Sequence, residues 1–285
     1  MALSKAMRIV LIIALSLTLV TGCSSRLKDK NVQREITPDV LASETDSPPP
    51  PESENAEEDI NFNDTGKTVI KAISLNRTYP NNSYLIITKE GTTICVDPTQ
   101  TIEGVKPDII AMTHSHSDHV DTKLVKNFPD IKTTKWTAES FEEKGIKVTG
   151  IASSHLGDTI PSTPSNVIYV FEADGLRIAH MGDIGQTQLT DEQLEALGTI
   201  DIAFMQFVNS YSGYSASDEK GINLIEQLKP QIIIPTHSSA EATESIGKIV
   251  GDYELADDIL VISKDDLSDG KRKVIEIRNT HVLNK

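Results

Sequence analysis

The chain of 285 residues has little cysteine, few aromatic residues and a deficit of positive charge. Cysteine occurs only at Cys23 and Cys95, which excludes a framework of structural disulfides. The chain has 27 lysine and arginine residues against 42 aspartate and glutamate residues, and its net charge of −15 disfavours nucleic acid as a partner. No Gly-x-Ser-x-Gly segment is present, so the sequence offers no serine nucleophile of that type.

Long apolar runs are also missing, and the one near the start is too short to cross a membrane. Ile9–Val20 spans twelve residues, follows the basic residues Lys5 and Arg8, and precedes small residues. This arrangement predicts a signal peptide over residues 1–23. The tetrapeptide Val20–Cys23 resembles a bacterial lipobox, which implies acylation (palmitate or a similar chain) of Cys23 after cleavage. An ordinary secretory signal with an incidental cysteine is the alternative.

Composition then divides the remainder of the chain. Residues 24–66 are acidic, contain Pro48–Pro51 and have few large apolar side chains, so we expect a disordered tether with a net charge of −7. Residues 67–285 carry a net charge of −10 and are long enough to bury a large core, which predicts a single domain. Cys95 lies in an apolar run and is expected to be a small core residue.

Three of the seven histidines lie in one short segment, Thr113–His119, which reads Thr-His-Ser-His-Ser-Asp-His. Imidazole and carboxylate groups are the ligands that zinc, iron and manganese accept. The apolar run that precedes the segment predicts a buried strand, so the histidines begin where that strand ends. Ligand sites lie beyond the carboxyl ends of strands in open α/β sheets. The segment therefore predicts a metal site with ligands for two ions.

Three further candidate ligands, His155, Asp183 and His237, each follow an apolar run that predicts a strand. Together with the Thr113–His119 segment they resemble the metallo-β-lactamase superfamily of metal-dependent hydrolases, over roughly residues 67–280. Within it, the stretch from Asp201 to His237 is most similar to the branch that includes ascorbate-6-phosphate lactonase. Sequence pattern alone predicts only an α/β or α+β fold, and the resemblance implies the family's four-layer αββα sandwich.

The resemblance also implies how the ligands divide. One ion would be held by His114, His116 and His155, the other by Asp118, His119 and His237, and Asp183 would bridge them. Well-known zinc β-lactamases have a cysteine in place of Asp183, which argues against antibiotic hydrolysis as the main activity. Flavo-diiron proteins have a carboxylate in place of His116, which disfavours oxygen reduction.

Two divalent ions at one site predict hydrolysis of an ester, lactone, amide or phosphodiester by activated water. In the family, Asp118 also orients that water and takes up its proton. Five histidines and two aspartates without a thiolate suit Zn²⁺, Mn²⁺ or Fe²⁺, and export from the cytoplasm favours Zn²⁺. Asn209, Tyr211 and Tyr214, in a loop after a predicted strand, are candidates for binding a substrate oxyanion.

Some expectations remain open at this stage. His180 is either a substrate-contacting or ligand-supporting residue, or an ordinary strand histidine. Residues Thr137–Lys144 are expected to form a helix that starts near a threonine cap. For the whole chain we expect a hydrolase of small molecules, anchored by lipid to the cell membrane and facing outside the cytoplasm. A non-catalytic metal- or ligand-binding lipoprotein and an iron oxidoreductase are the alternatives.

Overall fold

The computed structural model describes residues 59–78, 80–215, 219–237, 240–267 and 270–283. The predicted signal peptide, the lipidation residue Cys23 and most of the predicted tether lie outside these residues. In the described ranges, no helix combines the length and the hydropathy needed to cross a bilayer.

Strands of four or five residues, most of them apolar, build the first sheet, in the order β13-β1-β2-β3-β4-β5 among the described residues. The pairs that involve β1 and β2 are antiparallel, whereas β3, β4 and β5 run parallel. Its strands are β1 (Thr68–Ala72), β2 (Tyr84–Ile87), β3 (Thr93–Val96), β4 (Ile109–Met112), β5 (Lys132–Lys135) and β13 (Ile259–Ile262).

The second sheet has the order β12-β14-β11-β10-β9-β8-β7-β6 in the described part of the chain. Its β6 to β9 segment is an antiparallel meander, and β9, β10, β11, β14 and β12 are parallel. Its strands are β6 (Ser140–Glu143), β7 (Ile146–Ser153), β8 (Asn166–Ala173), β9 (Leu176–His180), β10 (Ile202–Gln206), β11 (Ile232–Thr236), β12 (Asp252–Asp257) and β14 (Lys273–Arg278).

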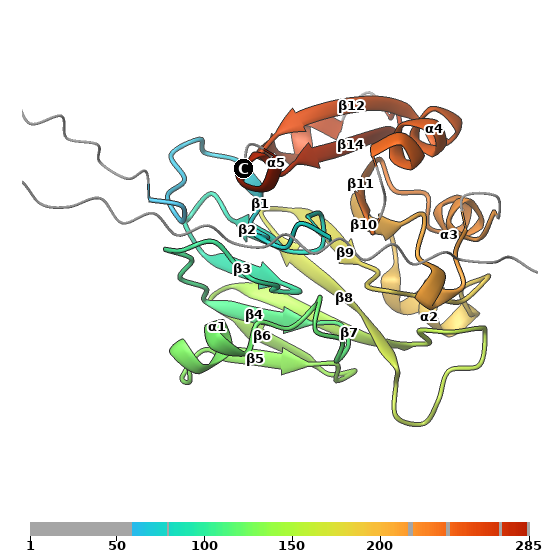
Figure 1. Cartoon of the computed structure of the whole chain (residues 1–285), viewed down its shortest axis with the longest axis horizontal. Coiled ribbons are helices and arrows are strands. Elements are labelled where there is room, and N and C mark those ends of the chain that lie inside the picture. Colours follow the sequence, from blue (N-terminus) through green and yellow to red (C-terminus); the bar gives the residue numbers. More distant parts are fainter. Residues whose placement is uncertain (1–58, 79, 216–218, 238–239, 268–269, 284–285) are drawn as a thin grey trace, which may run out of the picture. The chain divides into compact units, whose positions relative to one another are not determined.

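The helices lie outside the two sheets (Figure 1). They are α1 (Thr122–Asn127), α2 (Asp191–Leu197), α3 (Lys220–Leu228), α4 (Ala240–Val250) and α5 (Thr280–Leu283), with 3₁₀ turns η1 (Ser210–Ser212) and η2 (Lys264–Leu267). Asp121 caps α1, and Thr190 caps α2 through a reciprocal capping box with Gln193, which satisfies amide groups that would otherwise lack partners.

Three hydrophobic clusters confirm the αββα layers. The central cluster lies between the sheets and joins side chains of both, such as Tyr84 and Phe204, whose ring centroids are 4.8 Å apart. A second cluster joins the outer face of the second sheet to α2, α3 and α4, with Leu224 of α3 fully buried. A third lies on the outer face of the first sheet and includes Leu124 of α1. Burial on both faces explains why most of these strands are continuously apolar.

The helix expected over residues 137–144 is wrong, because this segment contains strand β6. Lys144 and Gly145 both have positive φ, 49° and 78°, so they form a tight turn that returns the chain into β7. Phe141 packs against the central cluster, and the Lys132 ammonium lies 4.3 Å from the centre of its ring. Pairing with β7 and packing of Phe141 therefore outweigh the local helix preference.

Residues 59–66, which the composition assigned to the tether, contact the domain. The Asn63 side-chain amide donates to the carbonyl oxygens of Lys67 and Thr88, at 2.8 and 2.9 Å. Asn61 donates to the Gly104 carbonyl at 2.7 Å, and Ile60 packs against the cluster outside the first sheet. The packed part of the chain thus extends at least to Asp59, whose carboxylate accepts from Asn61.

Candidate metal centre

The strand β4 ends at Met112, and the loop that follows it carries four candidate ligands. Thr113 is fully buried, and its hydroxyl lies 3.0 Å from His114 Nδ1. A turn in which the His119 amide donates to the His116 carbonyl, at 3.0 Å, brings the end of the segment back toward its start. This compact loop presents His114 and His119 from buried positions, whereas His116 is exposed.

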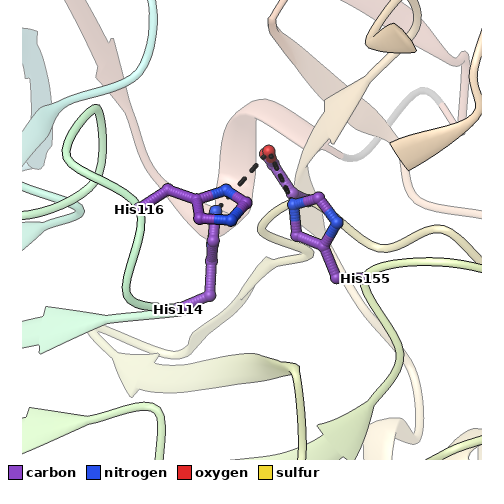
Figure 2. Close-up of side chains that lie close together, drawn as sticks. His114, His116 and His155 are labelled. Atoms are coloured by element: carbon purple, nitrogen blue, oxygen red, sulfur yellow. Dashed lines mark ion pairs between the residues drawn. The ribbon is translucent and has the colours of Figure 1, made fainter. Parts of the chain in front are cut away.

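His114, His116 and His155 form the first ligand group, and Figure 2 shows their rings turned toward one another around a carboxylate. His155 comes from the loop after β7, in the other sheet. Pairs of ring centroids are 4.7 to 4.9 Å apart. The carboxylate belongs to Asp183, whose Oδ2 lies 3.6 Å from His114 Nε2 and 3.5 Å from His155 Nε2.

Asp118, His119 and His237 form the second ligand group. His237 follows β11 and has a positive φ of 46°. Its Nε2 lies 2.9 Å from Nε2 of His119, and Asp118 Oδ2 lies 3.6 Å from the His119 nitrogen and 3.5 Å from that of His237. The other oxygen of Asp183, Oδ1, faces this group at 3.4 Å from His119 Nε2 and 3.2 Å from His237 Nε2.

The two oxygens of Asp183 therefore divide between the two groups. All seven side chains predicted as ligands lie in these groups, and they come from the ends of four strands, β4, β7, β9 and β11. Three polar atoms of the site, His114 Nε2, His155 Nε2 and Asp183 Oδ1, are buried and have no hydrogen-bond partner among the described residues. Buried polar atoms without partners are costly, and metal coordination would satisfy all three.

The protonation states of two of the candidate ligands, His114 and His237, also suit metal binding. Burial lowers the pKa of His114 to about 2 and, against the attraction of Asp183, lowers that of His237 to about 4. Both rings are therefore neutral at pH 7, as a metal ligand must be. Burial also acts to lower the pKa of His119, but the carboxylates of Asp97 and Asp183 outweigh it and raise that pKa to about 9.

Asp97, which the sequence analysis did not single out, supports the second ligand group through its contact with His119. Asp97 directly follows β3 and is fully buried. Its carboxylate accepts hydrogen bonds from the Thr113 amide and hydroxyl, both at 2.7 Å. Its Oδ2 lies 2.8 Å from His119 Nδ1, so it orients that ring with Nε2 toward the site. The sequence contained a signal for Asp97, because this residue also stands at the end of an apolar run, as the candidate ligands do.

His180, left open by the sequence, is a buried residue of the same network. Its Nε2 lies 3.0 Å from Asp97 Oδ2, and its Nδ1 accepts from the Gly182 amide at 3.2 Å. Since Nδ1 accepts, Nε2 carries the ring proton and faces the carboxylate. His180 thus connects the loop that carries Asp183 with Asp97, the carboxylate that orients His119. It does not reach the exposed side of the site.

Amide side chains hold Asp183 in place. Asn166 accepts from the Asp183 amide at 3.0 Å, and Asn209 donates to Asp183 Oδ2 at 2.7 Å. Gln206 accepts from the Asn209 amide at 2.9 Å. Asn82, fully buried, lies 2.8 Å from His237 Nε2 and 3.5 Å from Asp118 Oδ2 on the other side of the site. Sequence reasoning missed Asn82 and Asn166, because nothing local marks an asparagine that bonds across the fold.

The structure places the three residues expected to bind substrate in different surroundings. Asn209 is buried and bonds to Asp183, so it positions a ligand. Tyr214 is buried in the cluster under α3, and its hydroxyl donates to the Gln186 carbonyl at 3.0 Å. Tyr211 is 72% exposed, and it does not line the cleft beside the first ligand group.

That cleft has a volume of about 540 Å³, within the range of small-molecule sites. It opens on the first ligand group and is bounded by the loop after β7 and by the end of β5. Its lining consists of His114, Ser115, His116, Trp136, Ser154, His155, Leu156, Thr159, Pro161, Thr163, Pro164 and Ser165.

Comparison with known proteins agrees with this geometry. A family model described as the β-lactamase superfamily domain matches residues 78–237, which include all seven ligands. A metal-dependent hydrolase of the UPF0173 group from Thermococcus onnurineus is 26% identical over 176 residues, which cover 53% of this chain and 77% of the relative. A relative of the same description from Geobacillus is 25% identical over 199 residues, 56% of this chain and 84% of its own.

Solved structures share the fold. A zinc-dependent hydrolase of the metallo-β-lactamase superfamily from Thermotoga maritima superposes with a TM-score of 0.54 at 22% identity, over 74% of this chain and 98% of that chain. A metallo hydrolase from Ignicoccus hospitalis superposes with a TM-score of 0.52 at 13% identity, over 75% of this chain and 96% of that chain. At these identities the likeness concerns the architecture alone.

Proposed function

Because the chain belongs to the metallo-β-lactamase superfamily of metal-dependent hydrolases, we propose that its site holds two divalent ions and hydrolyses a small molecule with activated water. The observation that carries the proposal is the division of the Asp183 carboxylate. One oxygen faces His114 and His155, and the other faces His119 and His237, within 3.2 to 3.6 Å. A carboxylate shared in this way is the arrangement that a bridging ligand requires.

Each residue then has a defined task. His114, His116 and His155 would hold one ion, Asp118, His119 and His237 the other, and Asp183 both. Divalent ions at this site would make a water molecule acidic enough to act as a nucleophile near neutral pH. Asp118 is more exposed than the other two members of its ligand group, at 16% of its side chain, so its carboxylate could orient that water and accept its proton.

The ligand atoms narrow the choice of metal ion but do not determine which metal binds. Five imidazoles and two carboxylates, with no thiolate, suit Zn²⁺, Mn²⁺ and Fe²⁺. We propose Zn²⁺, because we also propose that the protein works outside the cytoplasm. The substrate classes open to this chemistry are esters, lactones, amides and phosphodiesters, and the sequence resemblance to the ascorbate-6-phosphate lactonase branch favours lactones.

The direct test measures metal content and turnover on the same sample. The purified full-length protein is expected to bind two ions and to hydrolyse members of a panel of generic esters, lactones and phosphodiesters. His116→Ala should lower turnover by about a hundredfold or more, as removal of a metal ligand does. His281→Ala, in α5 and outside both ligand groups, is the matched control. Undiminished turnover of His116→Ala, or two bound ions with no turnover at all, would contradict the proposal.

We also propose that the protein is a lipoprotein, with the domain tethered to a membrane through acylated Cys23. The support is the sequence alone: a basic start, a twelve-residue apolar run, a lipobox-like tetrapeptide and an acidic, proline-containing segment before the domain. The membrane would then be the partner of the anchor, and a small molecule the partner of the site.

A further inference from the structure

The cleft beside the first ligand group is neutral apart from the ligands themselves. Its twelve lining residues are three of the histidine ligands, five serines and threonines, and four apolar residues. None of them is a lysine, arginine, aspartate or glutamate. The protein's own recognition of a substrate in this cleft must therefore come from hydroxyl groups and apolar contact.

Trp136 forms a fixed part of the apolar wall. Its amide donates to the Met112 carbonyl at 2.8 Å, and its side chain packs against both the central cluster and the cluster outside the first sheet. The indole is only partly buried by these contacts and lines the cleft with the rest of its surface. A rigid aromatic surface of this kind offers apolar contact at low cost in conformational entropy.

Leu156 adds a second apolar surface. Although it directly follows the ligand His155, its side chain is 68% exposed, which is unusual for a leucine beside a buried site. Pro161 and Pro164 continue the apolar lining in the same loop. Covering Leu156 and the open part of Trp136 with an apolar group would remove both surfaces from water.

The hydroxyl groups of the cleft fall into two sets. Ser154 donates to the Leu156 carbonyl at 2.9 Å, and Ser165 accepts from the His155 amide at 2.9 Å, so both shape the loop that carries a ligand. Ser115, Thr159 and Thr163 are exposed and form no hydrogen bond within the described ranges. These three hydroxyls can donate to a neutral carbonyl, ether or hydroxyl oxygen of a substrate.

Charge argues against an anionic substrate. Proteins bind phosphate groups with arginine, lysine or helix amino termini, and the cleft lining contains none of these. Lys220 lies beyond Leu156, where its ammonium donates to the Gly213 carbonyl and lies 5.6 Å from the centre of the Tyr214 ring, so it is already engaged. Residues 67–285 carry a net charge of −10, so away from the proposed ions the domain repels an anionic group of a substrate.

We infer that the cleft selects an uncharged carboxylic ester or lactone whose apolar part packs against Trp136 and Leu156. This inference rests on the proposed hydrolase activity and narrows its substrate. Water adds to the carbonyl carbon, the bond from that carbon to the alcohol oxygen breaks, and the alcohol oxygen takes the proton. The products are a carboxylic acid and an alcohol, joined as a hydroxy acid if the substrate is a lactone, and no oxidant or reductant is needed.

A matched pair of substrates tests the charge preference. p-Nitrophenyl hexanoate and mono-p-nitrophenyl adipate share the leaving group and the chain length and differ by one distal carboxylate. With the zinc-loaded full-length protein, kcat/KM for the neutral ester is expected to exceed that for the anion by about tenfold or more. Thr163→Lys, which adds a cation to the lining, should reduce this ratio severalfold. Equal or faster hydrolysis of the adipate ester would overturn the inference.

Substitution of Trp136 tests the apolar wall. Trp136→Ala is expected to raise KM for p-nitrophenyl hexanoate by about five- to tenfold with a smaller change in kcat, and Trp136→Phe should restore most of the loss. Leu255→Ser, which removes an exposed apolar side chain on β12 away from the cleft, is the control and should leave both constants unchanged. An unchanged KM in Trp136→Ala would overturn the assignment of the wall.

Trp136 also provides a readout that does not depend on turnover, since it is the only tryptophan in the sequence. Titration with the neutral 4-phenylbutanamide is expected to change its fluorescence emission, and phenyl phosphate is expected to change it less at equal concentration. An unchanged emission at saturating amide concentrations would contradict contact with the indole.

The outcomes also separate this inference from the proposed activity. Faster hydrolysis of bis(p-nitrophenyl) phosphate than of the neutral ester would overturn the substrate class and leave the metal-dependent hydrolase in place. No hydrolysis of any of these compounds by protein that holds two zinc ions would overturn both.

Discussion

Asp97 lies outside both candidate ligand groups and yet orients a member of one of them. Burial acts to raise the pKa of its carboxyl, but His119 and His180 lower it well below its usual range, so the group is ionised. It accepts hydrogen bonds from Thr113 as well, at the start of the ligand loop. One buried negative charge thus fixes the start of the loop and the orientation of the His119 ring, and it strengthens that imidazole as a ligand.

The pKa of His119 leads to a prediction about proton release. Without a metal ion the ring has a pKa of about 9, so it is protonated near pH 7 and must lose that proton when an ion binds. Zinc affinity of the second ligand group should therefore weaken as pH falls below about 9. Calorimetric zinc titrations in buffers of different ionisation enthalpy, at pH values below and above this pKa, measure the protons released.

Asp97→Asn is the informative comparison for this experiment. The variant keeps the shape of the side chain and removes the charge that raises the His119 pKa, so proton release near neutral pH should decrease. Zinc affinity should also fall by about ten- to a hundredfold, as for other residues that orient metal ligands. Asp108→Asn, which removes a partly buried carboxylate that pairs with Lys144, is the matched control. Equal proton release by the wild type and Asp97→Asn would refute the argument.

The same shift has a consequence for the stability of the metal-free protein. A histidine whose pKa rises from 6.5 to about 9 on folding stabilises the folded state fully below the unfolded pKa. This contribution is lost as pH rises from about 6.5 through about 9. Bound metal removes the proton and with it this dependence on pH.

At the scale of elements, the site depends on two loops that are joined by their backbones. The loop after β7 carries His155, and the loop after β9 carries Asp183. The Gly185 amide donates to the Ser154 carbonyl at 2.7 Å, and the Gly157 amide donates to the Gly185 carbonyl at 3.1 Å. These backbone hydrogen bonds fix the distance between His155 and Asp183, which come from the same sheet.

Gly185→Ala is predicted to separate these loops. A Cβ at this position would lie 2.1 Å from the His155 carbonyl oxygen, so the backbone of one loop must move. We expect a loss of about 2–3 kcal/mol in the free energy of unfolding and weaker zinc binding, measured by denaturant titration and metal titration.

Gly175→Asn is the control for this substitution. Gly175 lies in the turn between β8 and β9, has no atom within 4 Å of an added Cβ, and has a positive φ that asparagine tolerates. It should change stability little and metal binding not at all. Wild-type stability and zinc affinity in Gly185→Ala would show that the loops adapt without cost.

At the scale of the whole molecule, the candidate ligands come from both sheets. His114, His116, Asp118 and His119 follow a strand of the first sheet, whereas His155, Asp183 and His237 follow strands of the second. Ions bound between them would add a bond between the layers at the edge where the central cluster ends. Metal binding should therefore stabilise the domain as a whole.

Removal of metal is thus predicted to lower the unfolding temperature. A chelator should cost about 3–4 kcal/mol at metal concentrations of about a hundred to a thousand times Kd, and added zinc should restore the midpoint. Differential scanning calorimetry measures the change. In His116→Ala the effect of the chelator should be smaller, and an unaltered midpoint in the wild type would show that the ions contribute nothing to the fold.

The tether leads to a second prediction at this scale. Cys23→Ala should leave the protein unprocessed or released from the membrane, because the proposed acyl chains would contribute roughly 0.8 kcal/mol for each buried methylene group. Membrane sedimentation after an alkaline wash, with immunodetection, measures the bound fraction. Cys95→Ala changes the only other cysteine, which is buried in the domain, and is the control. Sedimentation of Cys23→Ala with the membranes would contradict the anchor.

The sequence by itself determined the seven candidate ligands, because each stands after an apolar run and strand ends are locally encoded. The same rule would have found Asp97. It could not find Asn82 or Asn166, whose partners lie far along the chain, nor the strand β6, whose conformation depends on pairing with β7.

Only the tertiary structure decided how the ligands divide and what surrounds them. The direction of each Asp183 oxygen, the burial of Tyr214 and the neutral cleft beside Trp136 all result from packing two sheets and their loops against each other. Such contacts join residues that are distant in the chain. Local sequence therefore specifies the chemistry available at each strand end, and the fold specifies which groups meet there.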